Sequence, residues 1–312
     1  MPDPTPSKPS PVLVVGSVAF DRIKTPTADS GRILGGSTTY AAFASSYFAP
    51  TRIVGVVGTD FGEAGMQRLR RPNMDLEGLQ VDATGETFFW SGVYAENFAT
   101  RTTLETRLNV FANFQPVLPA AYRSSRYTLL GNIQPSLQAM VLDQLEPGSF
   151  VAADTMKLWL DIALPELHAL LPRVDLFILN DEEAAQLTGE GNVHVAGPAL
   201  QKLGPRIVLI KKGAHGAVLF HPDGLFALPA YPVLRVEDPT GAGDSFAGAL
   251  LGCLAASGRT DFKSLCRATA YATVTASLTV ESLGVDRLES AGRGEIDRRF
   301  AELVRMTQIP AD

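Results

Sequence analysis

The stretch from Asp238 to Ala249 reads Asp-Pro-Thr-Gly-Ala-Gly-Asp-Ser-Phe-Ala-Gly-Ala and combines small residues with a carboxylate. Gly241, Ala242 and Gly243 let main-chain N–H groups approach a ligand without side chains in the way. A helix is expected from about residue 244 to residue 256, and its N-terminus would add unpaired donors and a positive dipole end. These features predict an anion site that suits a phosphate group.

Asp244 is an unusual residue for such a site, because its carboxylate would repel a resting phosphate. The same carboxylate would accept a proton from a hydroxyl that attacks a phosphate. The motif therefore predicts phosphoryl transfer to an alcohol, with Asp244 as general base and the backbone of residues 241–243 as anion hole. The structural alternative is that Asp244 only caps the helix.

Competing nucleotide-binding motifs fit this stretch poorly. A dinucleotide-binding fingerprint needs a third glycine at the position of Phe246, which disfavours a dinucleotide-dependent oxidoreductase. No Gly-x-x-x-x-Gly-Lys-Ser/Thr sequence occurs in the chain, which excludes a Walker P-loop.

The motif resembles the C-terminal signature of the PfkB, or ribokinase-like, family of carbohydrate and nucleoside kinases, Asp-Thr/Pro-x-Gly-Ala-Gly-Asp-x-Phe. Other segments resemble family landmarks in the family's order from about residue 12 to residue 285. They are the first strand at 12–16 followed by Asp21, the di-glycine Gly35-Gly36, the segment 55–62, the Asn180–Glu183 element and the turn from Gly213 to Gly216. The resemblance implies an α/β fold of three layers, α/β/α, with a mostly parallel central sheet and a small β-sheet lid.

The resemblance also implies an acceptor site. Asp21 would accept hydrogen bonds from adjacent substrate hydroxyls, and Gly35 and Gly36 would bring the backbone close to the same substrate. Ribokinase-like proteins commonly carry Asn where this chain has Ala19 and Tyr40, which disfavours ribose.

Three further residues are candidates for substrate contacts. Thr106-Arg-Leu-Asn109 is similar to the Thr-Arg-x-Asn of some phosphosugar-using members, so Arg107 would pair with a substrate phosphate and Asn109 would bind the substrate. The alternative for Arg107 is a solvated side chain. Asn132 follows an expected strand and is a weaker candidate of the same kind.

The nucleotide side follows from the same resemblance. Asn180 and Glu183 would hold Mg²⁺ through water, although a capped helix start explains the same residues. Gly213 and Gly216 would form the nucleotide turn, and Lys211 stands where the family often has Thr. Lys211 would either reach a phosphate or be solvated.

A monovalent cation such as K⁺ is common in the family. The resemblance places it at Asp238 and Thr240, with residues 277–284 completing the site.

Composition sets limits on the class of protein. The chain has 312 residues, of which 46% are hydrophobic, and a net charge of −6, which argues against a nucleic-acid binder. No run of 18 apolar residues occurs, so no membrane span is expected. Residues 1–11 read as a disordered tail. Cys253 and Cys266 lie in apolar helical stretches and are expected as buried free thiols in a cytoplasmic protein.

The remaining chain, 12–312, reads as one kinase domain in which strands and helices alternate, as in a parallel sheet covered by helices. Two stretches, 17–35 and 86–110, alternate like short strands and are assigned to the lid; an ordinary edge hairpin is the alternative for 86–110. Strands are expected at 12–16, 52–57, 127–131, 150–153, 176–180, 207–211 and 217–221, and helices at 37–48, 61–70, 134–146, 161–171, 181–188, 261–280 and 293–306.

The sequence thus predicts an ATP-dependent, Mg²⁺-requiring kinase that acts on a hydroxyl of a small polyhydroxy compound. An unphosphorylated sugar or cyclitol is placed first, and a nucleoside, favoured by Tyr40 and the aromatic residues of 88–98, second. A phosphosugar kinase and a non-catalytic relative are less favoured. The expected partner is a small molecule, with no nucleic acid or membrane, and the protein would be a monomer or a homodimer paired through the lid.

Overall fold

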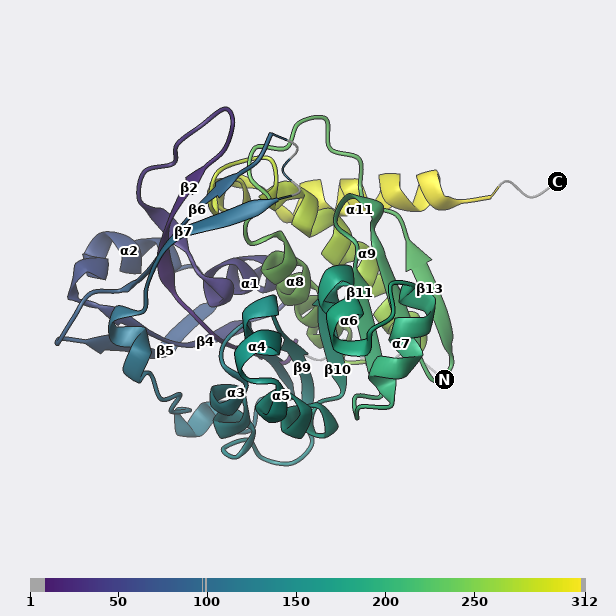
Figure 1. Ribbon diagram of the computed structural model, residues 1–312, viewed down its shortest axis with the longest axis horizontal. Helices are drawn as coiled ribbons and strands as arrows, with labels where there is room; N and C mark the ends of the chain where they lie inside the picture. The colour runs from purple at the N-terminus through teal and green to yellow at the C-terminus, as the bar shows by residue number, and fades with distance from the viewer. Residues whose placement is uncertain (1–8, 97, 99, 310–312) are drawn as a thin grey trace.

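Nine strands form the large central sheet of the computed structural model, which describes residues 9–96, 98 and 100–309 (Figure 1). Neighbouring strands are parallel, apart from the two strand pairs at one edge of the sheet, which are antiparallel. The mostly parallel sheet expected from the sequence is therefore confirmed. In pairing order the strands are β13 (Gly224–Leu228), β12 (Ala217–His221), β11 (Ile207–Lys211), β10 (Leu176–Asn180), β9 (Phe150–Asp154), β8 (Tyr127–Leu130), β1 (Val12–Val15), β4 (Thr51–Gly58) and β5 (Met74–Asp82).

Helices cover both faces of this sheet, which is why its central strands are continuous apolar runs. The four residues of β1 are fully buried, and they alternate between two hydrophobic clusters, one on each face. One face packs against α1 (Ser37–Ser46), α2 (Gly62–Leu69), α8 (Ala242–Ser257), α9 (Phe262–Thr279), α10 (Asp286–Ser290) and α11 (Arg293–Thr307). The other packs against α3 (Pro135–Leu142), α4 (Lys157–Ile162), α5 (Leu164–Leu170), α6 (Asp181–Thr188) and α7 (Val193–Gln201).

A separate sheet of four strands comes from the two stretches that break the α/β alternation. Its order is β3 (Ile33–Gly35), β2 (Ala19–Lys24), β6 (Phe88–Tyr94) and β7 (Arg101–Arg107). Figure 1 shows β2, β6 and β7 apart from the large sheet. The prediction of a small second sheet is confirmed, and an edge hairpin of the large sheet is excluded for β6 and β7. That this small sheet acts as a lid stays a prediction.

The small sheet is tied to the large one at Asp60, in the short 3₁₀ helix Thr59–Phe61 that follows β4. Oδ1 of Asp60 accepts hydrogen bonds from both N and Oγ1 of Thr87, each at 2.7 Å, just before β6. Arg32, just before β3, forms an ion pair with the same carboxylate. One carboxylate therefore joins both halves of the small sheet to the end of β4.

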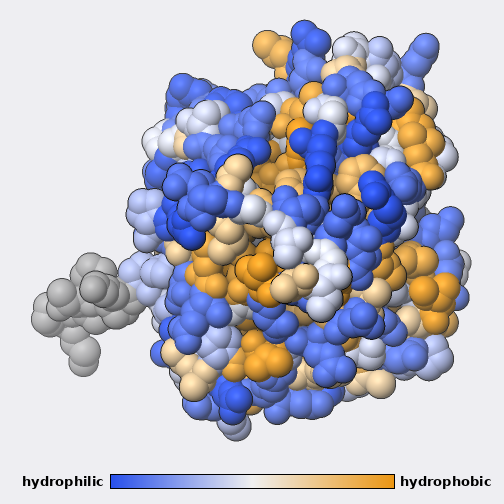
Figure 2. Space-filling model, turned by 90° about the vertical axis from the view of Figure 1, so that its left-hand side faces the viewer, coloured by the Kyte–Doolittle hydropathy of each residue, from blue (hydrophilic) through white to orange (hydrophobic). Residues whose placement is uncertain are grey.

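The outer face that carries the small sheet, α2 and β5 mixes polar and apolar side chains without one dominant patch (Figure 2). In the described part of the chain, no helix is long and apolar enough to cross a membrane. The prediction of buried free thiols is confirmed for Cys253, whereas Cys266 is only half-buried. Of the tail expected at 1–11, residues 1–8 lie outside the described residues, and residues 9–11 have no regular secondary structure.

Candidate active site

The start of α8 has the geometry of an anion site. Gly241 is the N-cap and adopts a left-handed conformation with φ of 75°, which glycine adopts without strain. The N–H of Ala242 donates to the carbonyl of Pro239 at 3.3 Å, so it is already engaged. Gly243 lies in the first turn of α8, where backbone N–H groups have no carbonyl acceptor within the helix. An anion hole at this helix start would therefore rely on Gly243 more than on Ala242.

Asp244 lies in this first turn and is partly exposed. The pKa of its carboxyl group is raised to about 7, first by burial and then by the negative charge of Asp154, against the lowering effect of Lys211 and Arg101. A carboxyl group with that pKa is about half ionised at neutral pH, which suits a general base.

Asp21 in β2 is brought to the same place. Its side chain is buried, and a Cβ on Gly35 would lie 1.9 Å from its Oδ2, so only glycine fits at that position. Burial, and then the charges of Asp238 and Asp244, raise the pKa of Asp21 to about 7, and the N–H of Gly36 bonds to its carboxylate. Gly36 caps the start of α1 with φ of 93°, where a Cβ would meet the carbonyl of Ser17.

Tyr40 in α1 is buried beside these carboxylates. Its ring packs on Gly241 and is buried, so it offers no open face for stacking on a nucleobase. Its hydroxyl has no hydrogen-bond partner among the described residues. Burial raises the pKa of this hydroxyl, and so do the charges of Asp21, Asp238 and Asp244. Tyr40 therefore brings an unpartnered hydroxyl group to this cluster of carboxylates.

Asp238 and Thr240 lie in the loop before α8. Oδ1 of Asp238 accepts from the N–H of Thr240 at 2.9 Å, while Oδ2 is buried and has no partner in the described part of the chain. Oγ1 of Thr240 lies 2.9 Å from the hydroxyl of Tyr94 in β6. A buried carboxylate oxygen without a partner is costly, so this site fits a cation.

Asn180 and Glu183 form a reciprocal capping box at the start of α6. The N–H of Asn180 donates to Oε2 of Glu183 at 2.8 Å, and the N–H of Glu183 donates to Oδ1 of Asn180 at 2.7 Å. The capped helix start, which is the structural alternative for these two residues, is therefore present. The pKa of Glu183 is raised to about 7, mainly by burial and also by the charge of Asp154, while Lys211 lowers it.

The fit of Mg²⁺ to this site is limited to contact through water. Among the described residues there is no group of three or more Asp, Glu, His or Cys side chains that could hold a metal. One carboxylate oxygen of Glu183 is engaged in the capping box, which leaves the other for a hydrated ion.

The end of β11 continues this side of the site. Lys211 Nζ lies 3.1 Å from Oδ1 and 3.2 Å from Oδ2 of Asp154, at the end of β9. Gly213 and Gly216 have φ of 52° and 91°, and a Cβ on Gly216 would lie 2.0 Å from the carbonyl oxygen of Leu228. The turn after β11 therefore requires glycine at position 216, and its role in holding a nucleotide stays a prediction. His215 is exposed.

Three predicted substrate residues have other partners. Arg107 stacks on Phe89 and pairs with Glu105 at 3.2 Å. Asn109 donates to the carbonyl of Thr87 at 2.8 Å, and Asn132 accepts from the indole N–H of Trp159 at 2.9 Å. Each of these three side chains thus has a partner within the protein, and their roles at the substrate stay predictions.

Arg101, at the start of β7, is a residue that sequence reasoning missed. It stacks on Trp90 and lowers the pKa values of Asp21 and Asp244. Neighbouring positions in a strand face opposite sides of a sheet, and Asp21 pairs with Trp90, so Arg101 shares the face of Asp21 while Arg107 on Phe89 lies on the other face. The sequence could have offered Arg101 only as a basic residue in an expected lid strand, since the strand register was not known.

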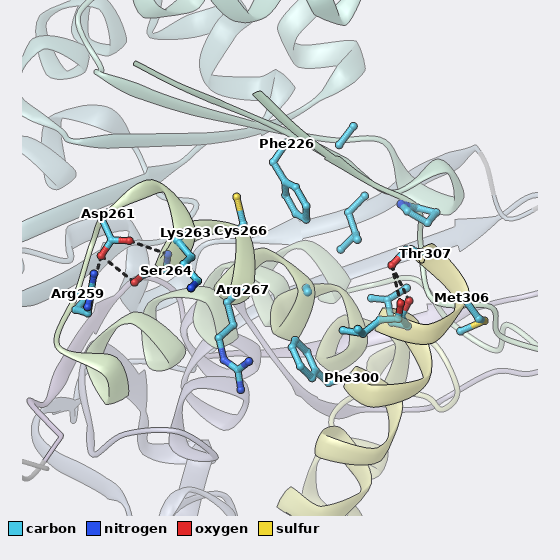
Figure 3. A pocket seen from close by; sticks show the side chains of 16 residues that line it. Phe226, Arg259, Asp261, Lys263, Ser264, Cys266, Arg267, Phe300, Met306 and Thr307 are labelled. Carbon is cyan, nitrogen blue, oxygen red and sulfur yellow. Dashed lines mark hydrogen bonds and ion pairs between the residues drawn. The ribbon is translucent and has the colours of Figure 1, made fainter. Parts of the chain in front are cut away.

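A groove of about 840 Å³ lies elsewhere, between β13, α9 and α11 (Figure 3). Phe226 and Phe300 point into it, with Arg267 at its side. None of its lining residues is a predicted site residue. The groove is therefore not part of the site built around Asp244.

The fold and the site together define a phosphotransferase of the α/β class with an alcohol acceptor. A family model described as pfkB family carbohydrate kinase matches residues 12–291, and the chain belongs to that family.

Similar proteins agree with this assignment. The cytidine kinase of Thermococcus kodakarensis is 28% identical over 247 residues, which are 77% of this chain and 87% of that protein. An Escherichia coli protein assigned as ribokinase II, solved with ATP and Mg²⁺, has a TM-score of 0.78 at 21% identity and covers 94% of this chain and 99% of its own. The nucleoside kinase of Burkholderia thailandensis, in complex with inosine, has a TM-score of 0.76 at 20% identity and covers 93% and 96%. The two solved structures support the ribokinase-like fold.

Proposed function

We propose that this chain transfers the γ-phosphoryl group of ATP to a hydroxyl of a small polyhydroxy acceptor, with Asp244 as general base. The observation that carries the proposal is the place of Asp244 in the first turn of α8, beside the N–H of Gly243 and with a pKa of about 7. The acceptor oxygen forms a bond to the γ-phosphorus, and its proton passes to Asp244. The bond from that phosphorus to the bridging oxygen breaks, and its electron pair leaves with ADP.

The acceptor is held on the side of Asp21. A buried carboxylate at that position accepts hydrogen bonds from two hydroxyls, and the close packing of Gly35 against it keeps the backbone near the same ligand. The unpartnered hydroxyl of Tyr40 adds a third polar group. These groups orient a ring or chain that carries several hydroxyls, so that one oxygen faces Asp244.

The nucleotide is held on the other side, by Lys211 and the turn from Gly213 to Gly216, with Asn180 and Glu183 nearby. Glu183 and Asn180 would hold Mg²⁺ through water, and the ion would supply neutralisation of phosphate charge. Asp238 and Thr240 would hold a monovalent cation such as K⁺, which the unpartnered Oδ2 of Asp238 supports.

The relatives bear on the acceptor. The cytidine kinase that matches most of this chain and the nucleoside kinase with inosine support a nucleoside, so we place a nucleoside first and an unphosphorylated sugar or cyclitol second, the reverse of the order from sequence. Arg107 is paired with Glu105 on the outer face of the small sheet, which weakens the support for a phosphosugar.

The assembly and location are proposed on simpler grounds. Strand β7 is an edge strand with all its residues exposed, so a homodimer would pair there, and a monomer is the alternative. The free cysteines support a reducing compartment, the cytoplasm.

An ADP-release assay with ATP and Mg²⁺ across nucleosides, free sugars and inositols tests this function. We expect release that depends on one acceptor class, strongest with a nucleoside. Release with sugars alone would restore the order from sequence. No acceptor-dependent release with any class would contradict the proposed function and favour a non-catalytic relative.

A further inference from the structure

Lys211 and Asp154 form a largely buried ion pair that the helix and sheet packing does not require. They stand at the ends of β11 and β9, on either side of β10, and meet across it. The side chains are 17% and 5% exposed. A lysine and an aspartate buried together gain little stability over apolar residues of similar volume, so a buried pair is often kept for another reason.

The position of the ammonium group gives that reason. A Cβ on Gly243 would lie 3.0 Å from Lys211 Nζ, so the ammonium lies against the first turn of α8, where the anion hole is. The missing side chain at Gly243 leaves room for the ammonium group beside the backbone N–H of that residue. In the described part of the chain, Asp154 is the only hydrogen-bond partner of Nζ. An ammonium group has three N–H bonds, so at least one remains for a ligand.

The charges around Lys211 keep it protonated. Burial alone would lower its pKa, but Asp154, Glu183 and Asp244 raise it. Its positive charge is therefore present before a nucleotide arrives. Three carboxyl groups would otherwise make this side of the site repel a triphosphate.

We propose that Lys211 binds the terminal phosphate of the nucleotide and the phosphoryl group in transfer, and that Asp154 is a positioning residue that holds the ammonium at the anion hole. The inference rests on the proposed function and deepens it, because it assigns the neutralisation of the moving charge to one side chain. Lys211 stays protonated during phosphoryl transfer, and only its hydrogen-bond partners change. The adjacent Lys212 follows the strand, and its backbone N–H donates to the carbonyl of Gly216 at 2.7 Å.

Nucleotide binding without acceptor provides the test. The dissociation constants of ATP and ADP, each with Mg²⁺, are measured by calorimetry for the wild-type chain, Lys211→Met, Asp154→Asn and the double variant. Lys211→Met should raise the dissociation constant of ATP at least tenfold and that of ADP less than threefold. The preference for ATP over ADP should therefore fall. Lys202→Met makes the same substitution at an exposed lysine at the end of α7 and should leave both constants unchanged.

The double variant separates positioning from structure. It removes both charges, so no unpaired charge stays buried, and it remains a fair test if Lys211→Met alone does not fold. Asp154→Asn should lower the preference for ATP when Lys211 is present, and should have no further effect when Lys211 is already Met. A purely structural pair would change stability in the single variants and leave the preference for ATP intact.

The outcomes distinguish a failure of the role given to Lys211 from a failure of the proposed kinase function. A wild-type chain that phosphorylates an acceptor, with a Lys211→Met variant of unchanged preference for ATP, would overturn the role of Lys211 and leave the kinase function standing. Equal effects of Asp154→Asn in both backgrounds would overturn the positioning role of Asp154. A wild-type chain that binds neither nucleotide would overturn both the inference and the proposed function.

Discussion

The ring of Tyr40 lies against Gly241 so closely that a Cβ on Gly241 would be 2.3 Å from the ring's Cγ. The contact joins α1 to Gly241, the N-cap of α8. Gly241 is thus fixed by two separate needs, its left-handed φ of 75° and the space for a buried ring. The start of α8, and with it Asp244, is positioned by this contact.

Gly241→Ala is expected to destabilise the protein by about 2–4 kcal/mol and to lower kcat at least a hundredfold, because the new methyl group displaces the ring and the first turn of α8. Gly258→Ala is the matched control, at the other end of the same helix. Gly258 has φ of 67° but no atom within 4 Å of an added Cβ, so its replacement should cost about 1 kcal/mol and leave kcat unchanged. Urea unfolding and steady-state rates measure both. Similar losses of activity in the two variants would contradict this role for the Tyr40 contact.

Tyr40→Phe should not destabilise the free protein, because the hydroxyl it removes is buried without a partner among the described residues. If that hydroxyl meets a substrate hydroxyl, the KM for the acceptor should rise about tenfold while the KM for ATP stays the same. Thermal unfolding without ligands and initial rates at varied acceptor provide the two readouts. A marked loss of stability with an unchanged acceptor KM would show that the hydroxyl serves the fold instead.

Arg101→Met should lower kcat/KM about tenfold or more at pH 7, because Arg101 lowers the pKa of Asp244 and its loss leaves less of that carboxyl ionised. The limb of the rate profile below neutrality should move to higher pH. The same change at Arg107, in the same strand but on the opposite face, should have little effect on an unphosphorylated acceptor. An equal loss in both variants would argue against a specific role for Arg101.

The pH dependence of the free protein follows from its buried carboxyl groups, and burial raises the pKa values of Asp154 and Asp238 as well as those of three others. Burial raises the pKa values of Asp21, Glu183 and Asp244 to about 7, so between about pH 4 and pH 7 the folded state holds more protons than the unfolded state. The free energy of unfolding should therefore decrease as pH rises through this window. The lowered pKa of His221 acts in the opposite direction, but it is a single group.

Urea unfolding at pH 5 and pH 8, without ligands, measures this effect. Asp261, whose ion pair with Arg259 holds its pKa at about 2, titrates below the window and does not interfere. The rate should behave in the opposite way, with kcat/KM falling about tenfold per pH unit below about pH 7 as the base is protonated. Stability that increases from pH 5 to pH 8, or a rate independent of pH, would contradict the assignment.

Much of the fold could be predicted because its signals are local. Helix α6 begins and ends where Asn180, the acidic first turn and Gly189 indicate, and the buried strands β1, β10 and β11 appear as apolar runs. Several elements were not expected, the short helix α10 among them. Strand β5 carries charged residues at alternate positions near the sheet edge, α7 contains Gly197 and Pro198, and β13 is a short edge strand.

The residues of the candidate site could be predicted where they lie together in one segment of the sequence. They could not be predicted where segments distant in the sequence meet. Residues 241–244 form the turn and helix start from their own sequence. The pairing of Lys211 with Asp154 depends on which strands are neighbours, and the place of Arg101 depends on the register of β6 with β7, which shifts at a bulge between Ser91 and Gly92. Sequence patterns do not fix either.

Phosphoryl transfer by Asp244→Asn is the most direct test of the account. The substitution keeps the shape of the side chain and removes only its ability to accept the proton, so the variant should bind ATP with Mg²⁺ as the wild-type chain does. With the best acceptor from the panel, its kcat should be lower by about a thousandfold or more. A kcat within about threefold of the wild-type value would contradict the role of Asp244 as the base.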